Sequence, residues 1–182
     1  MRGIERTLSD NTRQPKGFII REAVVDDAAP FLEFLDLVGA ETDNLTFGAE
    51  GFPFNEEQER AYIKNMHENE HSVTLLALKD GRIIGDASIS GLSRRMSHRA
   101  NLGISVLRDF WHIGVGSALL QGIVDYAKAH GVEIIDLEVR CDNTRAISLY
   151  ERFGFKRIGT YPAFYKINEE YVDFDIMYLD LR

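Results

Sequence analysis

The chain has 182 residues, of which 45% are hydrophobic and 27% are charged, and its formal net charge is −8. This length and composition are typical of one globular domain, and the negative charge argues against non-specific nucleic-acid binding, which requires cations that neutralise phosphates. Cys141 is the only cysteine and the five histidines are scattered, so the sequence predicts no intrachain disulfide and no metal site. We expect Cys141 to be a small buried hydrophobic residue.

Residues 1–16 are polar and contain no apolar segment of signal-peptide length, so we expect a flexible N-terminal extension. One domain is then expected over residues 17–182. No apolar run approaches the length of a membrane span, which predicts no membrane partner and a cytoplasmic location.

Hydrophobic periodicity and turn signals divide the chain into alternating elements. Strands are predicted over 18–23, 73–78, 83–89, 99–106, 134–139, 155–160 and 171–181, and a loop through Pro162 and Glu169 separates the last two. Helices are predicted over about 28–38, from 55 to 66, up to 130 and over 143–150. This order predicts a single α/β domain with a mixed sheet.

Several residues predict where these elements begin and end. Asp26 and Asp27 are expected to cap the first helix, and Asn55 opens the second. The pair Asp80-Gly81 predicts a tight hairpin turn, and Gly131 predicts a left-handed helix end.

The segment from Phe110 to Leu120, Phe-Trp-His-Ile-Gly-Val-Gly-Ser-Ala-Leu-Leu, lies where a predicted strand turns into a predicted helix. Glycines at Gly114 and Gly116 let the backbone approach a ligand closely, because they carry no Cβ. The first turn of the helix leaves N–H groups unpaired and carries partial positive charge. The segment therefore predicts an anion site, typically for a phosphate.

Other interpretations of this segment are open. A dinucleotide-binding loop would have a third glycine where Leu119 stands, and a P-loop would have a lysine between Gly116 and Ser117. A simple tight turn remains a further alternative.

A second motif, Asn143-x-x-Ala146-x-x-x-Tyr150-x-x-x-Gly154-Phe155, follows the glycine segment. Asn143 is a favourable helix N-cap, and Ala146 and Tyr150 share one helix face because they are four residues apart. The small Ala146 leaves space for a ligand beside the Tyr150 hydroxyl. The alternative is that Tyr150 is a core aromatic residue.

Together the two motifs resemble the GNAT superfamily of acyl-CoA N-acyltransferases, whose pyrophosphate loop is written Arg/Gln-x-x-Gly-x-Gly/Ala. The pattern runs here from Trp111 to Gly116, and Trp111 departs from the basic or amide residue at its first position. The resemblance implies a single α/β domain with a mixed, mostly antiparallel sheet, splayed at the cofactor site and flanked by about four helices. It also implies acetyl-CoA as the cosubstrate and direct transfer of the acetyl group to a primary amine, on a small molecule or a protein N-terminus.

The resemblance also implies which residues bind the cofactor. These are Ile104, Ser105 and Val106 beside the pantetheine arm, Trp111, His112, Ile113, Gly114, Val115, Gly116 and Ser117 around the pyrophosphate, and Asn143, Ala146 and Tyr150 on the following helix. Tyr150 would be the catalytic residue, a general acid that protonates the departing thiolate.

The acceptor side is less well defined by the sequence. Relatives often place a glutamate where this chain has Asn101, which cannot act as a base, and Glu41, Asp43 and His98 are substitutes. Glu41 and Phe47 are the expected substrate-binding residues. A homodimer is compatible with the sequence, and a non-catalytic acyl-CoA sensor or protein-interaction domain is the alternative function.

Overall fold

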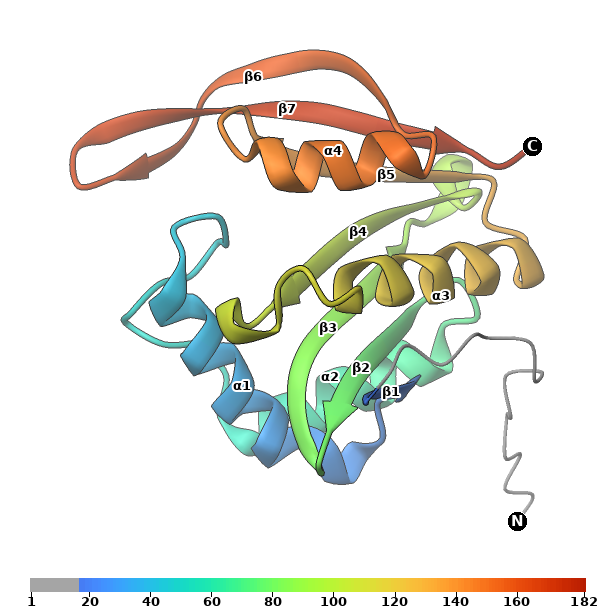
Figure 1. The fold of residues 1–182 in the computed structure, drawn as a ribbon. Helices are drawn as coiled ribbons and strands as arrows, with labels where there is room; N and C mark the ends of the chain where they lie inside the picture. Colours follow the sequence, from blue (N-terminus) through green and yellow to red (C-terminus); the bar gives the residue numbers. More distant parts are fainter. Residues whose placement is uncertain (1–16) are drawn as a thin grey trace.

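The computed structural model describes residues 17–182, so the extension expected over 1–16 lies outside the described residues. The described chain forms one seven-stranded sheet with four α-helices, in the predicted order of elements (Figure 1). The strands are β1 (Ile19–Glu22), β2 (Val73–Lys79), β3 (Arg82–Gly91), β4 (Arg99–Val106), β5 (Ile134–Arg140), β6 (Lys156–Ile167) and β7 (Glu170–Asp180). The α-helices are α1 (Ala28–Glu41), α2 (Glu56–Glu68), α3 (Val115–Ala129) and α4 (Thr144–Arg152), and short 3-10 turns are η1 (Val25–Asp27), η2 (Arg94–Met96) and η3 (Arg108–Phe110).

The sheet has the order β1-β2-β3-β4-β5-β7-β6. Every neighbouring pair is antiparallel except β4 and β5, which run parallel. The prediction of a mixed, mostly antiparallel sheet flanked by about four helices is therefore confirmed.

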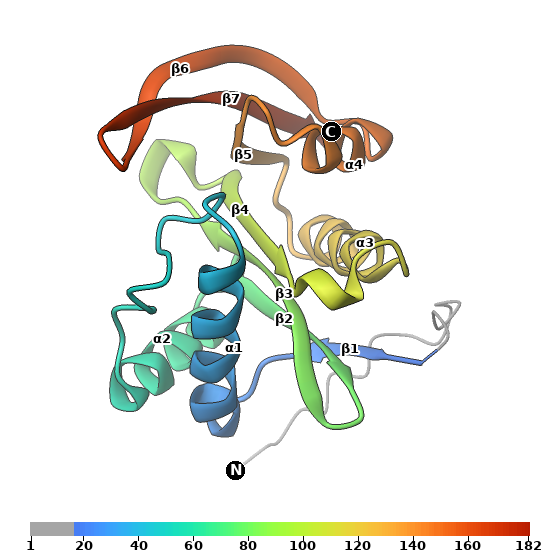
Figure 2. The ribbon, with the colours of Figure 1, turned by 60° about the vertical axis from the view of Figure 1, so that its left-hand side comes forward.

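Two hydrophobic cores lie on opposite faces of the first four strands. Helices α1 and α2 cover one face, and α3 covers the other (Figure 2). Successive residues of a strand point to opposite faces, so Leu75 packs into the α3 core while Leu76 packs into the α1 and α2 core. This explains why β2 is apolar almost throughout.

Local signals fix several element ends as expected. Asn55 accepts a hydrogen bond from the Gln58 backbone N–H, and the Gln58 side chain accepts one from the Asn55 backbone N–H, both at 2.9 Å. Gly131, after α3, has φ of 74°, and Asp80 and Gly81 have φ of 51° and 79° in the β2–β3 turn. The expected start of α2, end of α3 and hairpin turn are thus confirmed.

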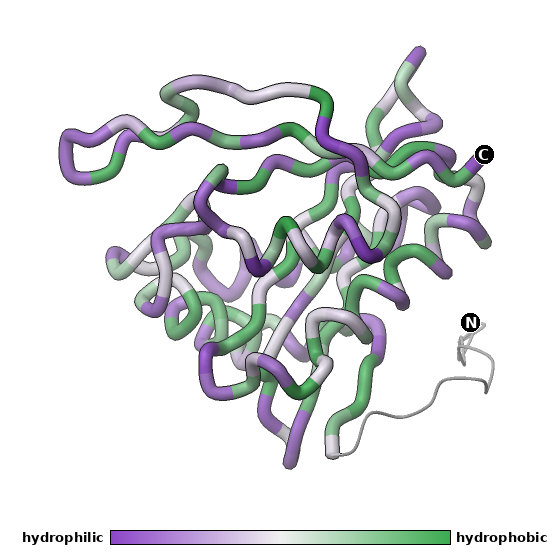
Figure 3. Tube along the Cα trace, turned by 45° about the horizontal axis from the view of Figure 1, so that its top comes forward, coloured by the Kyte–Doolittle hydropathy of each residue, from purple (hydrophilic) through white to green (hydrophobic). Residues whose placement is uncertain are grey.

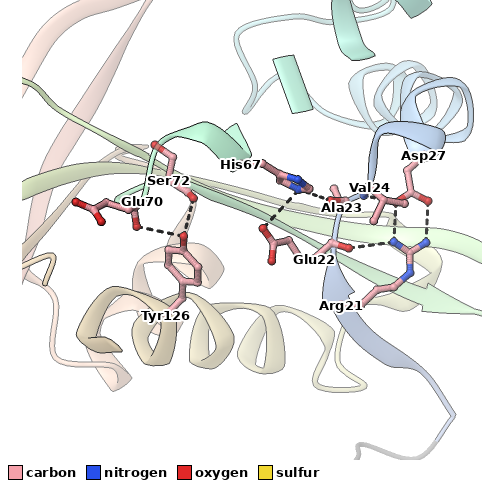
Figure 4. Close-up of polar contacts among 9 residues, drawn as sticks. All are labelled: Arg21, Glu22, Ala23, Val24, Asp27, His67, Glu70, Ser72 and Tyr126. Carbon is pink, nitrogen blue, oxygen red and sulfur yellow. Dashed lines mark hydrogen bonds and ion pairs between the residues drawn. The ribbon is translucent and has the colours of Figure 1, made fainter. Parts of the chain in front are cut away.

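Asp27 is used differently from the expected helix cap. It precedes α1, but its side chain makes no capping bond to that helix. Its carboxylate instead accepts two hydrogen bonds from the Arg21 guanidinium, at 2.6 and 2.7 Å, and one from the Val24 backbone N–H at 2.8 Å (Figure 4). A buried carboxylate gains more from a cation than from one amide, so Asp27 ties β1 to the start of α1.

The loop expected between the last two strands is wrong. Strand β6 continues to Ile167, and only Asn168 and Glu169 separate it from β7. The pairing with β7 is interrupted between Tyr161 and Tyr165, around Pro162. A sheet edge tolerates such an interruption, since β6 has a neighbour on one side only. Hydrophilic and hydrophobic residues are mixed along this hairpin (Figure 3).

The expectation that Cys141 is buried is wrong, because this residue follows the end of β5 and is exposed. Its thiol donates a hydrogen bond to Asp175, at an Sγ–Oδ1 distance of 3.1 Å. Within residues 17–182, no helix is long and apolar enough to cross a membrane. The same residues contain no cluster of three or more side chains suited to holding a metal ion.

We predict that Asn55→Ala lowers the free energy of unfolding by about 1 kcal/mol, because the first turn of α2 loses its cap. Urea denaturation measures the difference. Asn65→Ala in the same helix is the control, since Asn65 is exposed and alanine has the higher helix propensity. Equal stability of Asn55→Ala and the unmodified protein would contradict the prediction.

Candidate active site

Strands β4 and β5 are paired only at one end. Their register joins Arg99–Asn101 to Ile134–Asp136, and no later residue of β4 pairs with β5. Beyond this point the two halves of the sheet diverge, as Figures 1 and 2 show. The predicted splay between these strands is therefore present.

A bidentate ion pair spans the paired segment, from its first position on β4 to its last position on β5. The Arg99 guanidinium donates hydrogen bonds to both carboxylate oxygens of Asp136, at 2.8 and 2.5 Å. Both side chains are largely shielded from solvent, with exposed fractions of 32% and 15%. Such paired bonds fix the orientation of both groups as well as their separation.

The glycine segment forms a tight loop between η3 and α3. His112 and Gly114 both have positive φ, of 64° and 95°, and Gly114 immediately precedes the helix. A residue with a Cβ would be strained at Gly114, so this glycine also serves the fold. A Cβ at Gly116 would meet the Leu149 side chain at an ordinary 3.4 Å, so the fold has room for one there.

Trp111 is held in place at the start of this loop. Its indole N–H donates to the Val106 carbonyl at 2.7 Å, and the Arg145 guanidinium lies over its ring, 3.2 Å from the ring centroid. A second cation, Arg108, lies 5.7 Å from the same ring. The loop thus has two arginines beside its first position, although the residue at that position is not basic.

Helix α4 presents the second motif to the same region. The Asn143 side chain accepts a hydrogen bond from the Ala146 backbone N–H at 3.2 Å, which confirms the expected cap. Tyr150 is 7% exposed, and its ring contacts Phe155 with centroids 5.6 Å apart. Burial raises the pKa of the Tyr150 hydroxyl, so this group stays protonated at neutral pH.

One cleft of about 900 Å³ joins these elements to α1, α2 and the segment between them. Most of the expected site residues line it: Phe47, Ile104, Ser105, Val106, Trp111, His112, Gly114, Val115, Gly116, Ser117, Asn143, Ala146 and Tyr150. Two others do not. The Ile113 side chain is 47% exposed, and Glu41 lies beside a smaller pocket, where its carboxylate accepts a hydrogen bond from the Arg108 backbone N–H at 2.7 Å.

An aromatic wall closes the cleft on the α2 side. The rings of Phe47 and Phe52 meet edge-on with centroids 4.8 Å apart, and Phe52 contacts Phe54 in the same manner at 5.1 Å. Phe54 in turn lies 6.3 Å from Tyr62 of α2. This chain of contacts gives the long segment between α1 and α2 a fixed apolar surface toward the cleft.

Two buried carboxylates, not singled out from the sequence, also line the cleft. Glu59 of α2 is 1% exposed, and Asp86 of β3 is 9% exposed. Burial raises the pKa of Glu59 to about 7, and the nearby charge of Asp86 acts in the same direction. Burial also raises the pKa of Asp86 to about 7, although a hydrogen bond from the Ser105 hydroxyl at 2.5 Å opposes this change.

The sequence did contain a signal for this pair. Glu59 shares one face of α2 with the buried residues Ile63 and Met66, so an acidic residue interrupts an apolar stripe. Asp86 similarly interrupts the strand Ile83-Ile84-Gly85-Asp86-Ala87-Ser88-Ile89. A buried ionisable residue without a structural partner is a marker of functional sites.

We predict that the free energy of unfolding falls as pH rises from about 4.5 to about 7. In this window the folded protein keeps protons on Glu59 and Asp86 that the unfolded chain has released, so raising the pH favours unfolding. Each unit of pKa elevation corresponds to about 1.4 kcal/mol. Urea denaturation at a series of pH values measures the slope.

Glu59→Gln should make this slope shallower, because glutamine does not titrate. Glu57→Gln is the matched control, since Glu57 is exposed on the same helix and should leave the slope unchanged. The assignment is wrong if the slopes of Glu59→Gln and the unmodified protein coincide.

Comparison with known proteins agrees with this arrangement. The model of the Acetyltransferase (GNAT) family matches residues 39–155. L-amino acid N-acetyltransferase AaaT of Escherichia coli (strain K12) is 37% identical over 101 residues, which cover 54% of this chain and 62% of AaaT. The match thus spans less than two thirds of that relative.

Solved structures match over longer stretches. An acetyltransferase of the GNAT family from Streptococcus pneumoniae has a TM-score of 0.87 and 30% identity, covering 90% of this chain and 99% of that chain. The yncA protein of Salmonella typhimurium, described with its cofactor acetyl-CoA, shares the fold with a TM-score of 0.81 and 19% identity, covering 91% of this chain and 95% of that chain. From the family match and the pneumococcal structure together, the chain belongs to the GNAT family of acetyltransferases.

Proposed function

We propose that this protein transfers an acetyl group from acetyl-CoA to a primary amine, on a small molecule or a protein N-terminus. One observation carries the proposal: the split edge of the sheet, the glycine loop before α3 and the Tyr150 hydroxyl all face one cleft. The family supports the reaction type. The yncA structure supports acetyl-CoA as the donor.

The donor side of the cleft suits an extended molecule that ends in a pyrophosphate. Unpaired backbone groups along β4 could continue the sheet toward the ligand, and the first N–H groups of α3 favour an anion. The proposed contacts are Ile104, Ser105, Val106, Trp111, His112, Ile113, Gly114, Val115, Gly116, Ser117, Asn143, Ala146 and Tyr150. Arg145 and Arg108 supply positive charge beside the loop, in place of the basic residue that Trp111 replaces.

Bound acetyl-CoA supplies an acyl group on a thiol leaving group, and the amine attacks that group directly. The protein positions the two reactants, and backbone N–H groups at the cleft stabilise the developing negative charge. Tyr150 donates its proton to the departing thiolate. Burial favours its protonated form, and general acid catalysis contributes about 10²–10⁴-fold.

The acceptor amine must lose a proton before it can attack. An alkylamine with a pKa near 10.4 is neutral in only about one molecule in a thousand at pH 7. Asn101 is exposed and does not line the cleft, and the Glu41 carboxylate already accepts a hydrogen bond from the Arg108 backbone N–H.

The cytoplasmic location and the homodimer stay predictions.

The first test of this function uses Gly116→Val. The larger side chain should occupy the pyrophosphate position and raise the KM for acetyl-CoA by at least about tenfold, which corresponds to about 1.4 kcal/mol. The unmodified protein should gain about 2.7 kcal/mol of stability at acetyl-CoA equal to a hundred times its Kd, and the variant less at the same concentration. Thiol release and thermal unfolding measure the two effects.

Gly159→Val is the matched control, because Gly159 lies on β6 and a Cβ there would meet nothing within 4 Å. Normal acetyl-CoA binding by Gly116→Val would refute the loop assignment. Stabilisation of the unmodified protein by ATP or NAD, but not by acetyl-CoA, would refute the function itself. Acetyl-CoA binding without thiol release across a broad panel of amines would instead favour a sensor.

The second test is Tyr150→Phe, which removes the hydroxyl and keeps the ring. We expect turnover to fall by about 10²-fold or more while the Kd for CoA stays nearly constant, because the hydroxyl acts only as the thiolate leaves. The loss should shrink for an acyl donor with a more acidic thiol. Thiol-release kinetics and CoA titration on the same preparation measure both quantities.

Tyr126→Phe is the matched control. The Tyr126 hydroxyl donates to the backbone carbonyl of Ser72 at 2.9 Å, on the far side of the sheet from α1 and α2 (Figure 4). Its loss should lower stability by about 1 kcal/mol and leave turnover unchanged. If Tyr150→Phe behaves like Tyr126→Phe, then Tyr150 belongs to the core and water protonates the thiolate.

A further inference from the structure

The acceptor end of the cleft, which is the part lined by α1, α2 and the aromatic wall, contains buried polar groups. One of them is a carboxylate that receives no hydrogen bond from the described chain. Both carboxylate oxygens of Glu59 are buried and have no hydrogen-bond partner among residues 17–182. The Thr74 hydroxyl lines the same cleft and also has no partner among these residues. Leaving a buried charged group without a partner is costly, so this arrangement indicates a ligand that supplies the missing partner.

A second buried carboxylate, that of Asp86, lies next to the position where β4 and β5 separate. Asp86 of β3 lies directly opposite Ser105 of β4, and the Ser105 hydroxyl donates to its carboxylate at 2.5 Å. Ser105 belongs to the stretch of β4 that no longer pairs with β5. The two acids are close enough for the charge of Asp86 to act on Glu59. A group bound between them would therefore lie near the site of acetyl transfer.

The charges of the cleft are unevenly distributed. Its lysine or arginine lining residues among those described are Arg145 and Arg152, and both belong to α4. The acidic lining residues are Glu59, Asp86 and the exposed Glu138 of β5, and the acceptor end is otherwise lined by hydroxyl groups, Asn44 and the apolar side chains of α1 and the aromatic wall. A ligand with an ammonium group and an apolar body matches this end. A carboxylate on the ligand would instead face Glu59 and Asp86, with no protein cation to balance it.

We propose that Glu59 and Asp86 bind the ammonium group of the acceptor, which is a primary amine with an apolar body and no carboxylate, and that Glu59 is the proton acceptor. The proposal rests on the acetyltransferase function above. Glu59 accepts one proton from the –NH3⁺ group, and the freed lone pair forms the N–C bond as the C–S bond breaks. The nitrogen loses two protons in all. One ends on the sulfur through Tyr150, and the other passes from Glu59 to water.

The test compares 2-phenylethylamine with L-phenylalanine, which differ only in the carboxylate. Calorimetric titration in the presence of CoA, which carries no acetyl group to transfer, measures binding independently of turnover. We expect the amine to bind at least about tenfold more tightly than the amino acid. Glu59→Gln should weaken amine binding by about 30-fold or more and should slow acetylation of the amine. Glu57→Gln is the matched control and should change neither quantity.

Unchanged amine binding in Glu59→Gln would overturn the proposal, and so would tighter binding of L-phenylalanine or no binding of 2-phenylethylamine by the unmodified protein. Each of these results leaves the proposed function intact if CoA still binds and some amine is still acetylated. Failure to bind acetyl-CoA would instead overturn the proposed function. A loss of amine binding confined to Glu59→Gln, with CoA affinity unchanged, supports the site.

Discussion

The cleft exists because the paired segment of β4 and β5 is short. Three residues of each strand are in register, and an ion pair joins Arg99 at the first paired position of β4 to Asp136 at the last paired position of β5. If the ladder continued, the backbone groups of β4 would be occupied and the cleft would be filled by the sheet. Because it stops, the glycine loop of α3 and the tyrosine of α4 face each other across an opening that neither half of the sheet could form alone.

The two faces of the first four strands carry different tasks. The α3 face is apolar throughout, with Leu119, Leu120 and Ile123 fully buried against β2 and β3. The opposite face is apolar under α1 but turns polar along β3, where Asp86 and Ser88 line the cleft. A polar strip inside a core costs stability, and the fully apolar face offsets that cost. The buried acidic groups of the cleft therefore lie on the α1 and α2 face of β3, whereas the glycine loop and Tyr150 belong to the α3 side.

Local sequence signals predicted much of this architecture. The order of elements, the Asn143 cap and the Asp80-Gly81 turn each depend on neighbouring residues, and each agrees with the structure. The sequence also predicted the residues around the glycine loop as one group, and most of them line one cleft. The length of β6 was misjudged, because Pro162 signals a loop unless the strand is known to lie at a sheet edge.

The proximity of the two buried carboxylates, Glu59 and Asp86, could not be predicted from local sequence patterns. Glu59 and Asp86 are 27 positions apart in the sequence, and they meet only because α2 docks on the face of the sheet that Asp86 occupies. Arg145 stands over Trp111 for a similar reason, since α4 begins beside the glycine loop. Periodicity could have indicated that Glu59 was buried, but not what it would face.

The interruption in β6 has a consequence for how the protein behaves in a crowded solution. An open sheet edge offers a row of N–H donors on which another chain can add a strand and begin a fibre. Pro162 has no N–H to offer, and the N–H of Ala163 donates to the Asp173 carboxylate of its own hairpin at 2.8 Å. The row is broken at its middle. Tyr161 and Phe164 can therefore remain exposed on this edge without providing a template for aggregation.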